Sequence, residues 1–457
     1  MDINELIKSN LGVDTTPEIC NEFIIYAIRN SWTNYKKELM DKETVIKNEI
    51  NALPIRFVNG TVLKEYQQTI EINSDNIEDV WIEGLEQIGL TPEYNENNKK
   101  EFFVHGIPEN AGDFKVTLKY KYKGWCDGKT ILSRDFSITI NPDPHSLWKN
   151  IPTPTDIEFY KNDSDCEYLM VERLNGEYRK NMYAASQRGR SHAHEGKARD
   201  DDFKLFHCDN SDWYIMTVAD GAGSSQYSRK GSEIACKTAL EHCKEKLIDN
   251  KDFEEYIKIF KENETPENMK YVGDNIYDIV GNAAFKAHKA VITFATEKGY
   301  KAKDFATTLL LAICKKFDFG WFVASFWVGD GAMCIYDKGR QYIKMLGTPD
   351  EGEFSGQTRF LTMPEIFTDP KSFYGRLKFS IEKDFTALLL MTDGVSDPMF
   401  ETDVNLNNIE KWNELWDNIN SEVEMNDDKP ESKYQLLKWL DFWSQGNHDD
   451  RTIAILH

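Results

Sequence analysis

Four apolar segments of this 457-residue chain each carry an aspartate at one end, and these carboxylates are the side chains best placed to do chemistry. The segments are residues 213–219, 321–328, 388–392 and 451–456, and the aspartates are Asp220, Asp330, Asp393 and Asp449. Each segment has the length and composition of a buried β-strand, so each carboxylate is predicted to lie at a sheet rim. A lone Asp-Gly pair is a common hairpin turn, but four such strand ends together favour a shared site.

Carboxylates that converge on one point repel one another unless cations lie between them. Oxygen donors without a Cys or His cluster favour Mg²⁺ or Mn²⁺ over Zn²⁺. Gly221 follows Asp220 and lets the backbone approach closely, so its carbonyl could also reach a metal or a metal-bound water. The residues therefore predict a polycarboxylate, binuclear metal site.

The first of three regions along the chain, residues 1–52, is predicted to be helical. Thr16 and Pro17 are typical of a helix start. An apolar stripe at spacings near 3.6 follows, made of Phe23, Ala27, Ile28, Trp32, Tyr35 and Leu39. The stripe needs a surface to lie on, which could be the rest of this chain, a second copy or a partner.

Residues 53–141 change to a period of two, which is typical of strands with one buried face. The alternating apolar residues are Phe102, Val104, Phe114, Val116, Leu118, Tyr120, Phe136, Ile138 and Ile140. Asp127-Gly128 is a suitable two-residue hairpin turn. We expect a small β-sandwich of immunoglobulin-like type, either an interaction module or one that packs on its neighbour. Four prolines then mark residues 142–182 as a linker or strap.

Composition narrows the classes of function. The 55 basic and 77 acidic side chains give a net charge of −22, which disfavours nucleic acid as a partner. The apolar runs are too short to span a membrane, and residues 1–5 lack the basic start of a secretion signal. The eight cysteines are scattered without a Cys-x-x-Cys pair, so we interpret them as reduced thiols of a cytoplasmic protein.

Residues 183–457 resemble the PP2C-type, metal-dependent Ser/Thr protein phosphatases, in the variant of a bacterial subgroup. The resemblance rests on the order and the local sequence of five stretches. They are residues 189–192 with 200–203, residues 218–223, residues 307–309, residues 328–331, and residues 391–397 with 447–452. The resemblance implies an αββα sandwich, with two antiparallel sheets flanked by helices. The whole chain is thus expected to be α+β, with the helical segment and the β-sandwich preceding residues 183–457.

The resemblance also implies roles for individual residues. Asp220 would bridge two metals and Gly221 would add its carbonyl; Asp393 and Asp449 would complete one metal, and Asp200 would serve the other. Asp201 would lie behind these ligands, although a shift of one residue among Asp200, Asp201 and Asp202 stays open. Asp330 and Asp397 match positions that hold a third metal in bacterial relatives.

Two cations that share a water would lower its pKa and direct it in line at phosphorus. Two expected helpers are replaced: Gly196 stands at the place of a phosphate-binding Arg, and Ala222 at the place of a His. The candidates for phosphate binding are Arg188, Arg190, Lys197 and Arg199, and those for protonating the leaving group are His192, His194 or a metal-bound water. We take Arg190 and His192 as the catalytic candidates. The Gly-rich residues 347–361 lack a Walker arrangement and are interpreted as a flap beside the site.

The expected function is an Mg²⁺- or Mn²⁺-dependent phosphoserine/phosphothreonine protein phosphatase. The alternative is a weak or inactive phosphatase fold that binds phosphoproteins and signals. The expected partners are a phosphorylated protein, produced by a Ser/Thr kinase, and another subunit, identical or different, bound through residues 1–141.

Overall fold

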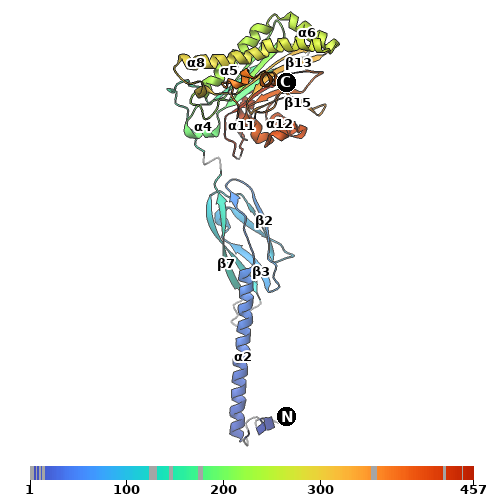
Figure 1. Ribbon diagram of the computed structural model, residues 1–457. Helices are drawn as coiled ribbons and strands as arrows, with labels where there is room; N and C mark the ends of the chain where they lie inside the picture. The colour runs from blue at the N-terminus through green and yellow to red at the C-terminus, as the bar shows by residue number, and fades with distance from the viewer. Residues whose placement is uncertain are drawn as a thin grey trace. The chain divides into compact units, whose positions relative to one another are not determined.

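The computed structural model describes residues 5, 6, 8, 9, 12, 16–122, 131–143, 148–172, 179–350, 358–425, 429–444 and 446–457. The chain divides into two compact units, Met1–Leu147 and Trp148–His457 (Figure 1). Among the described residues, no helix combines the length and the apolarity needed to cross a membrane.

The first unit begins with the long helix α2 (Pro17–Ala52), whose start is the predicted one. The Thr16 hydroxyl accepts a hydrogen bond from the Ile19 amide at 3.4 Å, and Pro17 occupies the first turn. Only the C-terminal end of α2 lies against the strands of its unit, where Ile46 and Ile50 join the core (Figure 1).

The predicted apolar stripe of α2 is wrong in one respect. Phe23 and Ile28 are five residues apart, so they lie about 140° apart around the helix axis. Phe23 and Ala27 are half-buried on one side, whereas Ile28, Trp32 and Tyr35 are exposed on another. The helix therefore carries two apolar faces.

Two sheets pack over the core of the first unit, as expected of a β-sandwich. One sheet has the order β1 (Gly60–Thr61), β7 (Ile131–Asn141), β6 (Gly112–Tyr122), β3 (Ile77–Glu83), and the other has β2 (Tyr66–Glu71), β5 (Glu101–Gly106), β4 (Leu90–Tyr94). The alternation holds in β6, where Val116, Leu118 and Tyr120 are buried. The predicted Asp127-Gly128 turn lies outside the described residues, and the immunoglobulin-like type stays a prediction.

The second unit has two antiparallel sheets between layers of helices. The first sheet has the order β10 (Asp202–Cys208), β11 (Trp213–Ala219), β12 (Leu309–Phe317), β13 (Gly320–Val328), β16 (Leu377–Glu382). The second has the order β15 (Tyr342–Met345), β14 (Ala332–Asp337), β17 (Ala387–Met391), β18 (Arg451–Leu456), β9 (Met182–Gln187), β8 (Ser164–Leu169). One apolar cluster fills the space between the sheets, and it includes Met216 from β11 and Leu390 from β17.

Helices cover both outer faces of this sandwich. The first sheet is covered by α5 (Ser228–Leu247), α6 (Lys251–Glu262), α7 (Pro266–Ile276) and α8 (Asn282–Glu297), and the second by α12 (Ile409–Glu422) and α13 (Ser432–Trp439). Shorter helices are α4 (Arg190–Glu195), α9 (Glu365–Thr368), α10 (Pro370–Gly375) and α11 (Asp393–Phe400). Every residue of β11 and β13 is buried. Strands that are buried on both faces carry continuous apolar runs rather than alternating ones, which explains the apolar sequences of these two strands. The predicted αββα architecture is confirmed.

Part of the predicted linker, residues 142–182, belongs to this second unit. Residues 164–169 form the edge strand β8, whose half-exposed, polar residues gave no clear periodicity. Before it, the Ile151 amide donates to the Ala193 carbonyl at 2.8 Å, and Arg188 donates to Thr153 at 2.7 Å. The stretch from Trp148 is thus a strap bound along the segment that leads into the site.

Candidate metal centre

The aspartates at the ends of β11, β13 and β17 meet at one edge of the sandwich. Asp220, Asp330 and Asp393 each offer an oxygen within 4.8 Å of the others. Asp449, which precedes β18, is close enough for its charge to act on both Asp220 and Asp393. Both sheets thus contribute two strand ends each.

The backbone around Asp220 is held by the residues that precede β12. The Asp220 amide donates to the Thr308 hydroxyl, and the Thr307 hydroxyl donates to the Asp220 carbonyl, both at 2.8 Å. A Cβ at Gly221 would lie 2.6 Å from the Asp200 carbonyl oxygen, so only glycine permits this close approach. Metal ligation by the Gly221 carbonyl stays a prediction.

The cluster carries more negative charge than its surroundings neutralise. Burial, and then the charge of the neighbouring carboxylates, raises the pKa of both Asp220 and Asp393 well above the ordinary value. Among the described residues, one oxygen each of Asp200, Asp201, Asp330 and Asp393 is buried without a hydrogen-bond donor. Buried carboxylate oxygens without donors are an arrangement that hard divalent cations fit.

The three consecutive aspartates have three different environments. The carboxylate of Asp201 is fully buried, accepts from the Thr392 and Thr452 hydroxyls at 2.9 and 2.7 Å, and acts on Asp220 and Asp393. Asp202 is paired with Lys161 at 2.9 Å and with Lys204 at 3.0 Å.

Asp200 points elsewhere, with its carboxylate 3.7 Å from the His192 ring. The structure therefore places Asp201, rather than Asp200, against the cluster, and the metal-binding roles expected of the two residues stay predictions.

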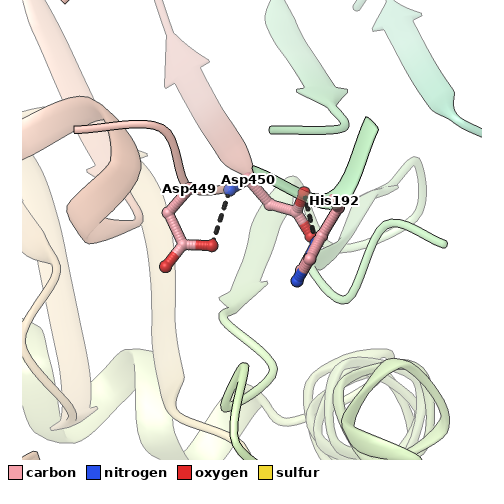
Figure 2. Close-up of side chains that lie close together, drawn as sticks. All are labelled: His192, Asp449 and Asp450. Atoms are coloured by element: carbon pink, nitrogen blue, oxygen red, sulfur yellow. Dashed lines mark hydrogen bonds and ion pairs between the residues drawn. The ribbon is translucent and has the colours of Figure 1, made fainter. Parts of the chain in front are cut away.

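Asp450 is a functional candidate that sequence reasoning missed. Its carboxylate accepts from the Gly189 amide at 2.6 Å and from the Asp200 amide, and lies 3.0 Å from His192 Nδ1 (Figure 2). Asp449 turns to the other side and caps the Asp450 amide at 2.8 Å (Figure 2). Neighbouring residues at the start of a strand face opposite ways, so the second acid of the pair could have been predicted to point inward.

His192 is buried between two carboxylates. Burial alone would lower its pKa, but the charge and hydrogen bond of Asp450, together with Asp200, raise the pKa to about 9. The ring is therefore a cation that joins Asp450 to Asp200. His194, the other candidate acid, accepts from the Lys149 amide of the strap at 3.0 Å.

A cavity of about 410 Å³ opens over the cluster, and its lining includes Ser191, His192, Lys197, Asp393, Asp397 and Asp449. Asp397 lies on α11 one turn after Asp393. Of the four basic candidates, Lys197 lines this cavity. Arg188 and Arg199 are buried and bound to the strap.

Arg190 does not reach the cavity. Its guanidinium donates to the Asp441 carboxylate at 2.8 Å and lies over the Trp443 ring at 5.4 Å. It faces a separate pocket, so the structure does not bring this predicted catalytic residue to the carboxylates.

The predicted flap touches the site at both of its described ends. The Asp350 carboxylate accepts from the Gly329 amide at 2.9 Å, and the Thr358 hydroxyl donates to Asp330. Residues 351–357 of the flap lie outside the described part of the chain.

A family model for protein phosphatase 2C matches residues 188–441. A search of curated proteins found no match. Among solved structures, a bacterial serine phosphatase is 17% identical, over 60% of this chain and 96% of that chain, with a TM-score of 0.34. Stp1 from Staphylococcus aureus is 15% identical (63% and 98%; TM-score 0.34), and the catalytic domain of PstP, in complex with two manganese ions, is 13% identical (61% and 97%; TM-score 0.32). Because the family model spans more than half of the chain, this protein belongs to the protein phosphatase 2C family.

Proposed function

We propose that this chain is a metal-dependent phosphatase that removes phosphate from phosphoserine and phosphothreonine in proteins. The observation that carries the proposal is the cluster of half-buried carboxylates, several with a buried oxygen that has no hydrogen-bond donor, beneath a cavity in a chain of this family. Manganese in the PstP structure supports the choice of metal.

The donor set fits Mg²⁺ or Mn²⁺ ions. Asp220, Asp330 and Asp393 would hold them, with Asp449 and Asp201 completing the set. Asp397, on the cavity wall, would serve a third ion. When bound, such cations lower the pKa of water, supply a nucleophile at neutral pH and neutralise charge on phosphate.

The remaining residues would position the substrate and the ligands. Lys197 is 59% exposed, so its ammonium group can reach a phosphate in the cavity after leaving Glu195, 2.6 Å away. The His192–Asp450 pair fixes the Gly189 and Asp200 amides, which keeps the two loops beside the cluster together. We therefore assign His192 to positioning rather than to proton donation.

The direct test is turnover by the purified chain. We expect hydrolysis of an aryl phosphate, and of phosphoserine and phosphothreonine peptides in preference to phosphotyrosine peptides, with Mn²⁺ or Mg²⁺ and none with EDTA. Phosphopeptide binding without turnover under any metal would favour the alternative, a phosphatase fold that binds phosphoproteins. The observation that favours this alternative is that Ala222 and Gly196 stand where a His and a phosphate-binding Arg were expected.

Substitution of Lys197 tests phosphate recognition. We expect Lys197→Met to raise KM for phosphopeptides about tenfold and to change kcat less than about twofold, because an exposed ion pair contributes little more than about 1 kcal/mol. The matched control is Lys258→Met on α6, where the lysine is 52% exposed and paired with Glu255. Equal KM values for the two variants would contradict the role of Lys197.

A further inference from the structure

The N-terminal half of α2 carries an apolar face that no described residue of its unit covers. The exposed fractions are 67% for Trp32, 54% for Tyr35, 51% for Ile28 and 50% for Ile25. A single helix of this length gains little from intrinsic propensity and is stabilised mainly by packing of an apolar face. Four large side chains on one exposed face therefore indicate an interaction surface.

The spacing of this face is that of a coiled-coil seam. Ile25, Ile28, Trp32, Tyr35 and Leu39 alternate steps of three and four residues, which is the a/d pattern of a heptad. Ile46 continues the same spacing and packs into the sandwich core. The seam thus meets the core-facing side of α2 at Ile46, beside the buried Glu43 and Ile50, and is uncovered from there towards Pro17.

We propose that a second copy of this chain covers the seam, with the two α2 helices antiparallel. In the register centred between Ile28 and Trp32, Trp32 of one copy packs on Ile28 of the other, and Tyr35 packs on Ile25. Each layer then pairs a large ring with a smaller aliphatic side chain. A parallel pair in register would instead place Trp32 against Trp32 and Tyr35 against Tyr35.

Charge flanking the seam favours the same orientation. The antiparallel register sets exposed Glu22 of one copy beside exposed Lys36 of the other, and the symmetry repeats this pair. The parallel register sets Glu38 beside Glu43 of the other copy. Arg29 meets its own copy at the antiparallel two-fold axis, which is an unfavourable contact.

The length of α2 that precedes the sandwich also fits the antiparallel pairing. The antiparallel register puts Pro17 of one copy opposite Glu43 of the other, where Glu43 accepts from the Tyr122 hydroxyl at 3.1 Å and the sandwich begins. The overlap of residues 17–43 is about 40 Å long. Its side chains would bury about 1,000 Å² in total, which is the lower limit for a specific interface and fits a dimer that dissociates on dilution.

Sedimentation of the full-length chain over a range of concentrations tests the proposal. We expect a dimer that dissociates on dilution, and Trp32→Asp to raise the dissociation constant at least about 100-fold, because it removes a central aromatic twice per dimer. The control is Tyr26→Asp, since Tyr26 is 66% exposed but lies on the opposite side of α2 from the seam. Circular dichroism confirms that both variants keep the wild-type fold.

Charge reversal tests the orientation. Lys36→Glu and Glu22→Lys should each weaken the dimer about fivefold, and the double variant should restore it. Arg29→Ala should tighten it. In a parallel dimer, residues 22 and 36 of the two copies are about 21 Å apart, so the double variant would not recover. A chain that stays monomeric at all concentrations, or that forms a higher oligomer, would overturn the proposal. So would a Tyr26→Asp variant that weakens the dimer as much as Trp32→Asp does, or a double charge-reversal variant whose dimer affinity does not recover.

Discussion

Asp220→Asn should lower kcat/KM for a phosphopeptide by at least about a thousandfold, which is about 4 kcal/mol of transition-state stabilisation. Asp220 lies at the centre of the cluster, and its pKa responds to burial and then to Asp393, Asp201, Asp449 and Asp330. Removing its charge therefore disturbs every cation that these carboxylates would hold. Asn keeps the size of the side chain, so the loss reports charge rather than packing.

The control for this loss is Asp209→Asn, because Asp209 also ends a strand but its side chain is 96% exposed at the far end of β10. Asp209→Asn should keep wild-type turnover. Asp393→Asn should match Asp220→Asn. Turnover within about tenfold of wild type in either cluster variant would contradict the proposed site, and steady-state kinetics at saturating Mn²⁺ separates the outcomes.

The convergence of the aspartates could be predicted because strand ends are geometrically constrained. An apolar run long enough to cross a buried sheet must deliver the residues that follow it to the rim, and oxygens of Asp220, Asp330 and Asp393 do lie within 4.8 Å of one another. The architecture followed from the family resemblance together with these runs. The half-exposed edge strand β8 gave no periodicity and could not be predicted.

The direction of individual side chains could not be predicted, because it depends on partners far away in the chain. Arg190 is drawn away by Asp441 and Trp443, more than 200 residues later. Asp202 is neutralised by Lys161 from the strap, and this contact decides the order among the three aspartates. Because Lys161 reaches Asp202 only in the folded chain, the sequence alone does not indicate which of the three carboxylates lacks a neighbouring positive charge.

Without metal, the same substitution should act in the opposite direction on stability. In EDTA at pH 8, Asp220→Asn should raise the free energy of unfolding by about 2 kcal/mol. Burial, and then neighbouring carboxylates, raise the pKa of Asp220 in the folded chain, so the folded state binds this proton more tightly than the unfolded state. Stability is then lost as pH rises above the unfolded pKa of about 4 and through the folded pKa. Asn carries no such cost.

Urea denaturation followed by tryptophan fluorescence, in EDTA and in Mn²⁺, measures this inversion. In EDTA the wild type should lose stability as pH rises above about 4, the unfolded pKa, and the variant should lose less. With Mn²⁺ at about 100 times its dissociation constant, the wild type should gain about 2.7 kcal/mol and the variant much less, which reverses their order. Asp209→Asn should follow the wild type throughout. If Asp220→Asn were the less stable chain in EDTA, the carboxylates would not be in mutual repulsion, and the physical basis for placing cations between them would be lost.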